Sequence, residues 1–134
     1  RSDWEVGTVG DVLASLGRTT LHTVDVDTKV KAATEMFKQY GISQLPVLDQ
    51  GKLVGILTES DMLHSLVNNR ITATTIVGEV MVRQVSTVAT TASSSELPRI
   101  FERGEVALVV DQQRNLLGLV TKMDLIELLA KPMA

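Results

Sequence analysis

The stretch Gly55-Ile-Leu-Thr58-Glu-Ser-Asp61 decides the fold of this chain, because the chain contains it twice. The second copy is Gly118-Leu-Val-Thr121-Lys-Met-Asp124, and the pattern Gly-x-x-Thr-x-x-Asp recurs at a constant offset, 118 − 55 = 63. Each copy follows a short apolar run and precedes an amphipathic segment. This pattern is typical of a buried strand, a polar turn and a helix. The sequence therefore predicts one supersecondary unit that is repeated within a single chain.

Each threonine of the motif stands where a helix is expected to begin. Its hydroxyl can accept a hydrogen bond from a free backbone amide, and the aspartate three residues later can reach back to the threonine amide, as in a capping box. The same position can also bind phosphate or carboxylate, because it combines free N–H groups with the positive end of the helix dipole. A carboxylate there can instead accept hydrogen bonds from two ribose hydroxyls. Two copies at matched spacing, each led by a glycine that permits close approach, favour ligand sites over simple caps.

The segments around the two motifs correspond as well. Gly41 and Gly104 stand where the first long helix of each half is expected to end. Short polar turns between apolar runs predict a hairpin in each half. The first half is predicted to have strands at 23–26, 45–48 and 53–57 and helices at 29–40 and 62–67; the second half has strands at 87–88, 106–110 and 116–120 and helices from 93 to 103 and at 125–129. Each half thus has the order β-α-β-β-α after a short leading helix, which predicts an α/β (α+β) fold of two halves packed face to face.

The composition excludes several classes of function. A chain of 134 residues with 44% hydrophobic residues is sized for one compact domain. The net charge of 13 − 16 = −3 and the aromatic content of 3% disfavour nucleic-acid binding. The chain has no cysteine, and His22 and His64 lack a paired spacing, so we expect no metal site. No apolar run reaches the length of a membrane span and no signal peptide is visible, so we expect a cytoplasmic protein without membrane contact. Because the chain starts with Arg1 and not Met, we expect a piece of a longer protein.

With its doubled motif, the chain resembles a tandem pair of CBS domains, also called a Bateman module, from about Thr8 to Leu129. The resemblance implies two repeats related by a pseudo-two-fold axis. It also implies a regulatory module that binds an adenosyl compound and has no catalytic residues. The corresponding division is a linker at 1–7, which carries Trp4, a first repeat at 8–69, a connector at 70–75 and a second repeat at 76–130.

The resemblance also assigns roles to individual residues. Asp61 and Asp124 become the carboxylates that hold ribose, and Thr58 and Thr121 become the hydroxyls beside them. Each cleft takes the wall for the adenine from the opposite repeat. These walls are Ile42 and Gln44 for the Asp124 cleft, and Glu105 and Val106 for the Asp61 cleft, while Thr20 matches a further contact.

The two clefts are not expected to be equal. Glu59 and Glu105 would add negative charge near a phosphate in the Asp61 cleft, at a cost of about 1 kcal/mol each at partly exposed positions. The second repeat also lacks the proline that leads the corresponding strand of the first, Pro46. We therefore expect Asp124 and Thr121 to form the primary site.

Within the family, the second half is most similar to the C-terminal regulatory region of cystathionine beta-synthase enzymes, through Val106-Ala-Leu-Val-Val110 and the segment 117–126. This similarity implies S-adenosylmethionine as the ligand and the catalytic domain of a pyridoxal-phosphate enzyme as a partner. An AMP or ATP sensor in another protein is an alternative, in which Lys122 could meet a phosphate. A structural dimerisation module with empty clefts is another. An enzyme is disfavoured, because Asp61 and Asp124 belong to two equivalent sites and do not face each other across one substrate.

The helices after the two motifs carry wide apolar arcs. The arc covers roughly 140° of the helical wheel in the first half and roughly 160° in the second, more than a core-facing stripe of about 100° needs. Such arcs indicate either deep burial within the pair or a self-association surface. Together with the habit of the family, they predict a homodimer. The residues of the two arcs are Met62, Leu63, Leu66 and Val67, and Leu125, Ile126, Leu128 and Leu129.

Overall fold

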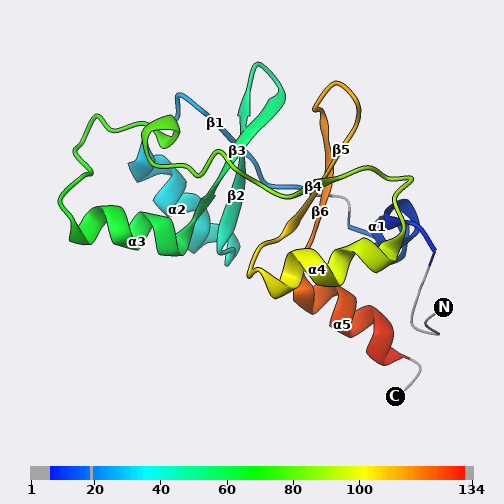
Figure 1. The fold of residues 1–134 in the computed structure, drawn as a ribbon. Helices are drawn as coiled ribbons and strands as arrows, with labels where there is room; N and C mark the ends of the chain where they lie inside the picture. The colour runs from blue at the N-terminus through cyan, green and yellow to red at the C-terminus, as the bar shows by residue number, and fades with distance from the viewer. Residues whose placement is uncertain (1–6, 19, 132–134) are drawn as a thin grey trace. The chain divides into compact units, whose positions relative to one another are not determined.

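The computed structural model describes residues 7–18 and 20–131, so Trp4 and nearly all of the linker predicted at 1–7 lie outside the described residues (Figure 1). The chain forms two three-stranded sheets with helices beside them, which confirms the mixed α/β class. These elements divide into two compact units. The continuous unit runs from His22 to Val85, and the split unit combines the residues up to Leu21 with those from Ser86 onward.

The continuous unit contains one sheet in the order β1-β2-β3. Strand β1 is parallel to β2, whereas β2 and β3 form the predicted antiparallel hairpin. In this unit Leu45, Val47 and Leu57 are fully buried, so alternate apolar side chains of the hairpin build the core. The elements are β1 (Val24–Asp25), α2 (Val30–Tyr40), β2 (Gln44–Asp49), β3 (Lys52–Thr58), α3 (Glu59–Val67) and the 3₁₀ turn η1 (Val77–Glu79).

Helix α2 packs one face on this core, as its 3.6-residue period predicts. Val30, Ala33 and Phe37 are buried, and Gly41 ends the helix with φ +62°. Tyr40, which the period places on the same face, is instead 43% exposed, and its ring stacks on His22 with 3.9 Å between the ring centroids. The apolar face of α2 therefore ends one turn before the helix does.

The split unit repeats this plan with the sheet order β4-β5-β6, in which β4 is parallel to β5 and β5 is antiparallel to β6. The helix predicted to start in the serine cluster is divided in two: Ser93 caps a 3₁₀ turn, and the α-helix begins after it. The elements are α1 (Val9–Leu16), β4 (Thr87–Val88), η2 (Ser94–Glu96), α4 (Leu97–Glu102), β5 (Ala107–Val110), β6 (Leu116–Val120) and α5 (Lys122–Ala130).

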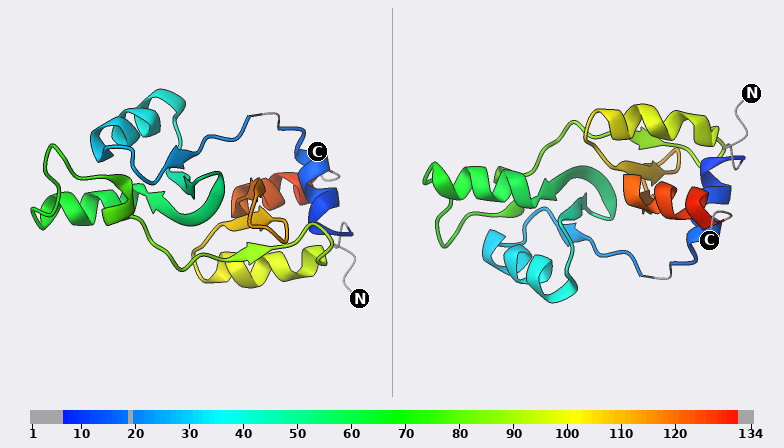
Figure 2. Two further views of the ribbon diagram at one scale, coloured as in Figure 1. Left: turned by 90° about the horizontal axis from the view of Figure 1, so that it is seen from above. Right: turned by 90° about the horizontal axis from the view of Figure 1, so that it is seen from below.

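The leading segment of each sequence repeat belongs to the unit of the other repeat. Helix α1 opens the first repeat, yet Val9 N–H donates to the Ala92 carbonyl at 2.8 Å, and α1 lies beside α5 (Figure 2). The turn η1 opens the second repeat, yet Val77 N–H donates to the Thr28 carbonyl at 2.7 Å. The compact units are therefore not the sequence repeats, because each unit includes the first segment of the other repeat.

The two motif glycines lie against these leading segments. A Cβ on Gly118 would come within 2.8 Å of the Leu13 side chain on α1. A Cβ on Gly55 would come within 2.6 Å of the carbonyl oxygen of Val82, which pairs with Ile56 in a short bridge after η1. The close approach that glycine permits here is thus made by the chain's own leading segments.

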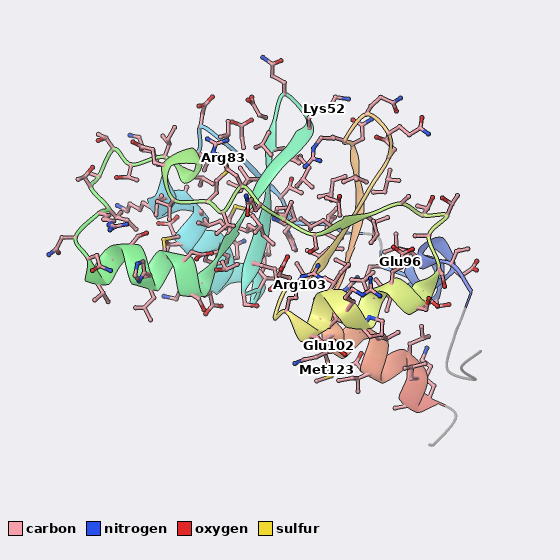
Figure 3. The ribbon with its side chains drawn as sticks, viewed as in Figure 1. Lys52, Arg83, Glu96, Glu102, Arg103 and Met123 are labelled. Atoms are coloured by element: carbon pink, nitrogen blue, oxygen red, sulfur yellow. The ribbon has the colours of Figure 1, made fainter. Side chains whose placement is uncertain are left out.

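Large apolar side chains are exposed on the two helices that follow the motifs. Only Met62 on α3 and Leu125 on α5 are buried. Met123 on α5 projects from its helix (Figure 3). The exposed set comprises Leu63, Leu66 and Val67 on α3, and Met123 and Ile126 on α5, between 48% and 71% exposed. Over the described residues, no helix has both the length and the apolar character needed to cross a membrane.

Candidate functional site

The second motif forms a complete capping box where β6 passes into α5. Thr121 adopts an extended backbone, and its hydroxyl oxygen accepts a hydrogen bond from Asp124 N–H at 3.1 Å. In return, Asp124 Oδ2 accepts from Thr121 N–H at 2.8 Å. Both halves of the predicted box are therefore present, and they hold the carboxylate at the helix N-terminus with 15% of the Asp124 side chain exposed.

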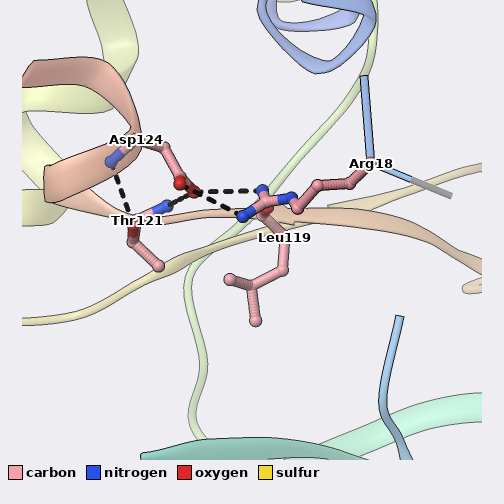
Figure 4. A network of polar contacts seen from close by, with 4 residues as sticks. All are labelled: Arg18, Leu119, Thr121 and Asp124. Atoms are coloured by element: carbon pink, nitrogen blue, oxygen red, sulfur yellow. Dashed lines mark hydrogen bonds and ion pairs between the residues drawn. The ribbon is translucent and has the colours of Figure 1, made fainter. Parts of the chain in front are cut away.

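A guanidinium group from the end of α1 meets this carboxylate (Figure 4). Arg18 Nη1 donates to Asp124 Oδ1 at 3.1 Å, and Nη2 lies 3.0 Å from Oδ2. Nη2 also donates to the carbonyl oxygen of Leu119 in β6. Arg18 thus bridges the strand and the helix on either side of Thr121, in the bidentate geometry that suits a guanidinium and a carboxylate. Its side chain remains 44% exposed.

A small hollow adjoins this ion pair within the split unit. It has a volume of about 160 Å³ and includes Arg18, Thr20 and Gly118 in its lining, so the structure places Thr20 on the same side as the arginine. Pockets that enclose a small-molecule ligand are usually about 300–1,000 Å³. This hollow alone is therefore too small for a whole nucleoside with its 5′ substituent.

The first motif makes different hydrogen bonds where β3 passes into α3. Thr58 Oγ1 accepts from Asp61 N–H at 3.1 Å, as in the other copy. The Asp61 carboxylate, however, accepts from the Thr58 hydroxyl at 2.6 Å, so it binds the side chain of Thr58 and not its amide. Among residues 7–18 and 20–131, no basic side chain lies within ion-pair distance of Asp61. The Asp61 carboxylate is thus bound by a neutral hydroxyl alone.

The predicted wall residues fall in the two units as follows. Ile42 and Gln44 belong to the continuous unit, where Gln44 pairs with Thr58 in the β2–β3 register. Val106 belongs to the split unit, directly before β5, together with Thr20, Thr121 and Asp124. The structure does not test which wall serves which aspartate, and that assignment stays a prediction.

Glu105 is not the free negative charge that the sequence interpretation assumed. Its carboxylate accepts from the Ser86 hydroxyl at 2.6 Å and from Arg103 Nε at 3.2 Å. Arg103, which is labelled after the end of α4 in Figure 3, also donates to Ser86 at 2.7 Å, and this bond closes a three-residue network. The Ser86 hydroxyl, and after it Arg103, hold the pKa of the Glu105 carboxyl below its usual value. Because Arg103 compensates the charge of Glu105, this carboxylate should repel an anionic ligand in the Asp61 cleft less than the sequence suggested.

Sequence reasoning missed Arg18. It lies 106 residues from Asp124 along the chain and outside both motif copies. Its position relative to Asp124 follows from the packing of α1 in the split unit, which neither the repeat nor its periodicity indicates. The sequence pattern therefore identified Asp124 as a site residue but gave no indication that Arg18 would pair with it.

Comparison with known proteins supplies the family. The model of the CBS domain matches twice, at residues 9–68 and 77–131. The uncharacterized protein MJ0188 of Methanocaldococcus jannaschii is 34% identical over 78% of this chain and 38% of its own length. The cystathionine beta-synthase of Dictyostelium discoideum is 30% identical over 81% of this chain and 23% of its own length.

A solved structure extends the likeness to the whole arrangement of elements. The CBS domain pair of protein MJ0100, solved in complex with 5′-methylthioadenosine and S-adenosyl-L-methionine, matches with a TM-score of 0.78 and 26% identity, over 93% of this chain and 97% of that one. The chain spans less than two fifths of the two curated relatives above. From the two family matches and this shared architecture, we conclude that the chain belongs to the CBS-domain family as a tandem CBS pair.

Proposed function

We propose that this CBS pair is a regulatory module that binds an adenosyl compound and carries out no chemistry of its own. The observation that carries the proposal is the pair of helix N-termini at which a threonine cap and an aspartate are held together, one in each unit. The similarity to MJ0100, whose CBS pair was solved with two adenosyl compounds, supports the same class of ligand.

The chemistry of each site suits a ribose. An ionised carboxylate is purely an acceptor, with about four lone-pair positions, so it can accept from both hydroxyls of a vicinal diol. The helix N-terminus adds partial positive charge for an anionic group nearby. In this proposal Asp124, Thr121, Thr20, Ile42 and Gln44 form the primary site. Asp61, Thr58 and Val106 form a second, weaker one.

S-adenosylmethionine is the ligand we propose first, and a cystathionine beta-synthase-like pyridoxal-phosphate enzyme of the cytoplasm is the parent we propose. The similarity to the Dictyostelium enzyme supports the parent, and MJ0100 supports the ligand. AMP or ATP is the second candidate. Arg18 favours that candidate more than the sequence did, because it places a guanidinium, which pairs well with phosphate, at Asp124.

We also propose that the module is a homodimer that associates through α3 and α5. The exposed side chains Leu66 on α3 and Ile126 on α5 support this, since exposed apolar patches on a helix mark interaction sites. In sedimentation, the wild-type module should have the mass of a dimer, and Leu66→Glu should shift it toward monomer. A wild-type module that stays monomeric at high concentration contradicts the proposal.

The test of the ligand proposal is a calorimetric titration of the wild-type module with S-adenosylmethionine, AMP and ATP. At least one ligand should bind, and Asp124→Ala should weaken its binding about tenfold or more, because two hydrogen bonds to a charged group are lost. Asp61→Ala, as the matched control, should have the smaller effect. If no adenosyl compound binds, the alternative of a purely structural module replaces this proposal. If Asp61→Ala abolishes binding and Asp124→Ala does not, the primary site is assigned wrongly.

A further inference from the structure

We propose that Arg18 selects the ligands of the Asp124 site: it occupies the carboxylate in the free module, and only a ligand with an anionic group on the 5′ side of its ribose gives the displaced guanidinium a new partner. The shared chemistry is a phosphate or a carboxylate joined to a vicinal diol. This inference rests on the proposed function and adds to it a rule for choosing among adenosyl compounds.

The first step of the argument counts acceptor positions on Asp124. The carboxylate has about four lone-pair positions. Oδ2 receives Thr121 N–H at 2.8 Å and lies 3.0 Å from Arg18 Nη2, and Oδ1 receives Arg18 Nη1 at 3.1 Å. Hydrogen bonds from Thr121 N–H and Arg18 Nη1 fill two of the four positions, and Nη2, an ion-pair partner 3.0 Å from Oδ2, covers a third, so one position on Oδ1 stays open. A vicinal diol needs two, so a ribose binds with both hydroxyls only after Arg18 has left the carboxylate.

The second step concerns the arginine after it has left. A guanidinium stays protonated at every physiological pH, so it carries its charge wherever it moves. The Arg18 side chain is 44% exposed and follows Gly17, which has φ +64°, so it can turn toward solvent once its bonds to Asp124 and Leu119 break. With a neutral nucleoside bound, water is the only new partner for its charge. With an anion bound, the lost ion pair is replaced by another charge-assisted one.

The third step places the anion on the side where Arg18 lies. Arg18 lines the hollow of about 160 Å³ together with Thr20, Leu21 and Gly118. This hollow is too small for a nucleoside. Its lining includes Arg18, which binds the carboxylate that is proposed to hold the ribose, so a substituent of the ribose is what can reach it. The displaced guanidinium would then remain within reach of that substituent.

A purely structural role for Arg18 makes a different prediction. Its bonds to Leu119 and Asp124 tie the segment after α1 to both β6 and α5. If Arg18 only held these elements together, removing it would weaken all ligands by the same factor. The selection proposal instead requires the change to depend on whether the ligand carries a phosphate or a carboxylate, and pairs of ligands with and without that group can measure that.

The experiment titrates four ligands, in two matched pairs, into the wild-type module, Arg18→Gln, Arg18→Lys and the control Arg99→Gln. AMP is paired with adenosine, and S-adenosylmethionine with 5′-methylthioadenosine. Arg99 is an exposed arginine on α4 of the same unit, so Arg99→Gln makes the same change of charge away from Asp124. Thermal melts of the free variants verify that each one is folded.

In the wild type, the member that carries the phosphate or the carboxylate should bind more tightly in at least one pair. In Arg18→Gln that preference should fall about tenfold, because neither ligand has to displace the arginine any longer and the phosphate or carboxylate loses its partner. Arg18→Lys should keep part of the preference, since lysine retains the charge and loses the bidentate geometry. A loss confined to the AMP pair identifies phosphate as the anion, and a loss confined to the S-adenosylmethionine pair identifies the carboxylate.

Three results overturn the inference. If Arg18→Gln weakens both members of each pair equally, or changes neither, Arg18 does not select ligands, although the proposed function stands. If Arg99→Gln lowers the preference as much as Arg18→Gln, the effect is one of net charge alone. If no ligand binds the wild-type module, the proposed function has failed, and this inference fails with it.

Discussion

The two copies of Gly-x-x-Thr-x-x-Asp have the same key residues and make different bonds. Asp124 binds the amide of its own cap and an arginine that follows α1, whereas Asp61 binds the hydroxyl of its own cap. Gly118 faces a leucine side chain, whereas Gly55 faces a backbone carbonyl. In each case, part of the difference comes from a segment outside the motif's own repeat. A repeated motif thus sets the local backbone geometry. The segment that packs against the motif decides which of its hydrogen-bonding groups are left to bind a ligand.

The largest expected difference between the two motifs is in their tolerance of alanine at the glycine. Gly55→Ala should lower the free energy of unfolding by about 2–3 kcal/mol, because its Cβ would lie 2.6 Å from the Val82 carbonyl oxygen and the backbone would have to shift. Gly118→Ala should cost about 1 kcal/mol, because the flexible end of Leu13 can turn away. Urea denaturation of both variants measures the difference, and equal losses would show that the leading segments pack alike.

A smaller difference is expected when each aspartate of the ligand-free module is removed. Asp124→Ala deletes an acceptor of the Thr121 amide and breaks the Arg18 pair, which should cost about 1–2 kcal/mol of unfolding free energy. Asp61→Ala deletes a bond to the Thr58 hydroxyl while the hydroxyl still caps Asp61 N–H, which should cost about 0.5 kcal/mol. Denaturation in low and high salt gives a further measure. The loss of stability in Asp124→Ala should be smaller in high salt, because salt already screens the ion pair that this variant lacks, whereas the loss in Asp61→Ala involves no ion pair. A larger loss for Asp61→Ala would contradict the bonding described for the two sites.

The smallest expected effect on stability is that of a change at Glu105. This residue of the split unit stands at the repeat position that Ile42 has in the continuous unit, since 105 − 42 = 63. The pKa of Glu105 is lowered in the folded state, so its contribution to stability is complete above its unfolded pKa, near 4.5, and is lost as the pH falls through the lower folded pKa. In Glu105→Gln, the free energy of unfolding should therefore fall slightly less than in the wild type as the pH is lowered. Above pH 6, the plots of unfolding free energy against pH should be parallel for the two proteins. Denaturation midpoints between pH 3 and pH 7 test this. An unchanged acid side in Glu105→Gln would mean that the Ser86 and Arg103 contacts do not stabilise the fold.

Local sequence pattern predicted the elements well. The strands before each motif, the helices after them, the hairpins and the ending of α2 at Gly41 all follow from short-range periodicity and turn chemistry, and the structure confirms them. The sequence pattern did not predict contacts between residues that are distant in the chain. It missed the bond between Arg18 and Asp124, the compensation of Glu105 by Arg103, and the packing of α1 with residues near Ala92. It also placed Tyr40 on the buried face, since a helical period does not indicate where the underlying sheet stops.

The bond between Val9 and Ala92 has a consequence for how the chain is made. On the ribosome, α1 emerges before the continuous unit, but the strands of its own unit are translated after the whole continuous unit. The continuous unit, from His22 to Val85, has all of its residues available early and can complete its own sheet while α1 is still without a partner. Closing the split unit then requires a contact between distant parts of the chain, and such contacts form slowly. Synthesis therefore gives the Asp61–Thr58 cap its neighbours within the continuous unit first, and the pair of Asp124 with Arg18 is assembled only when α5 has left the ribosome.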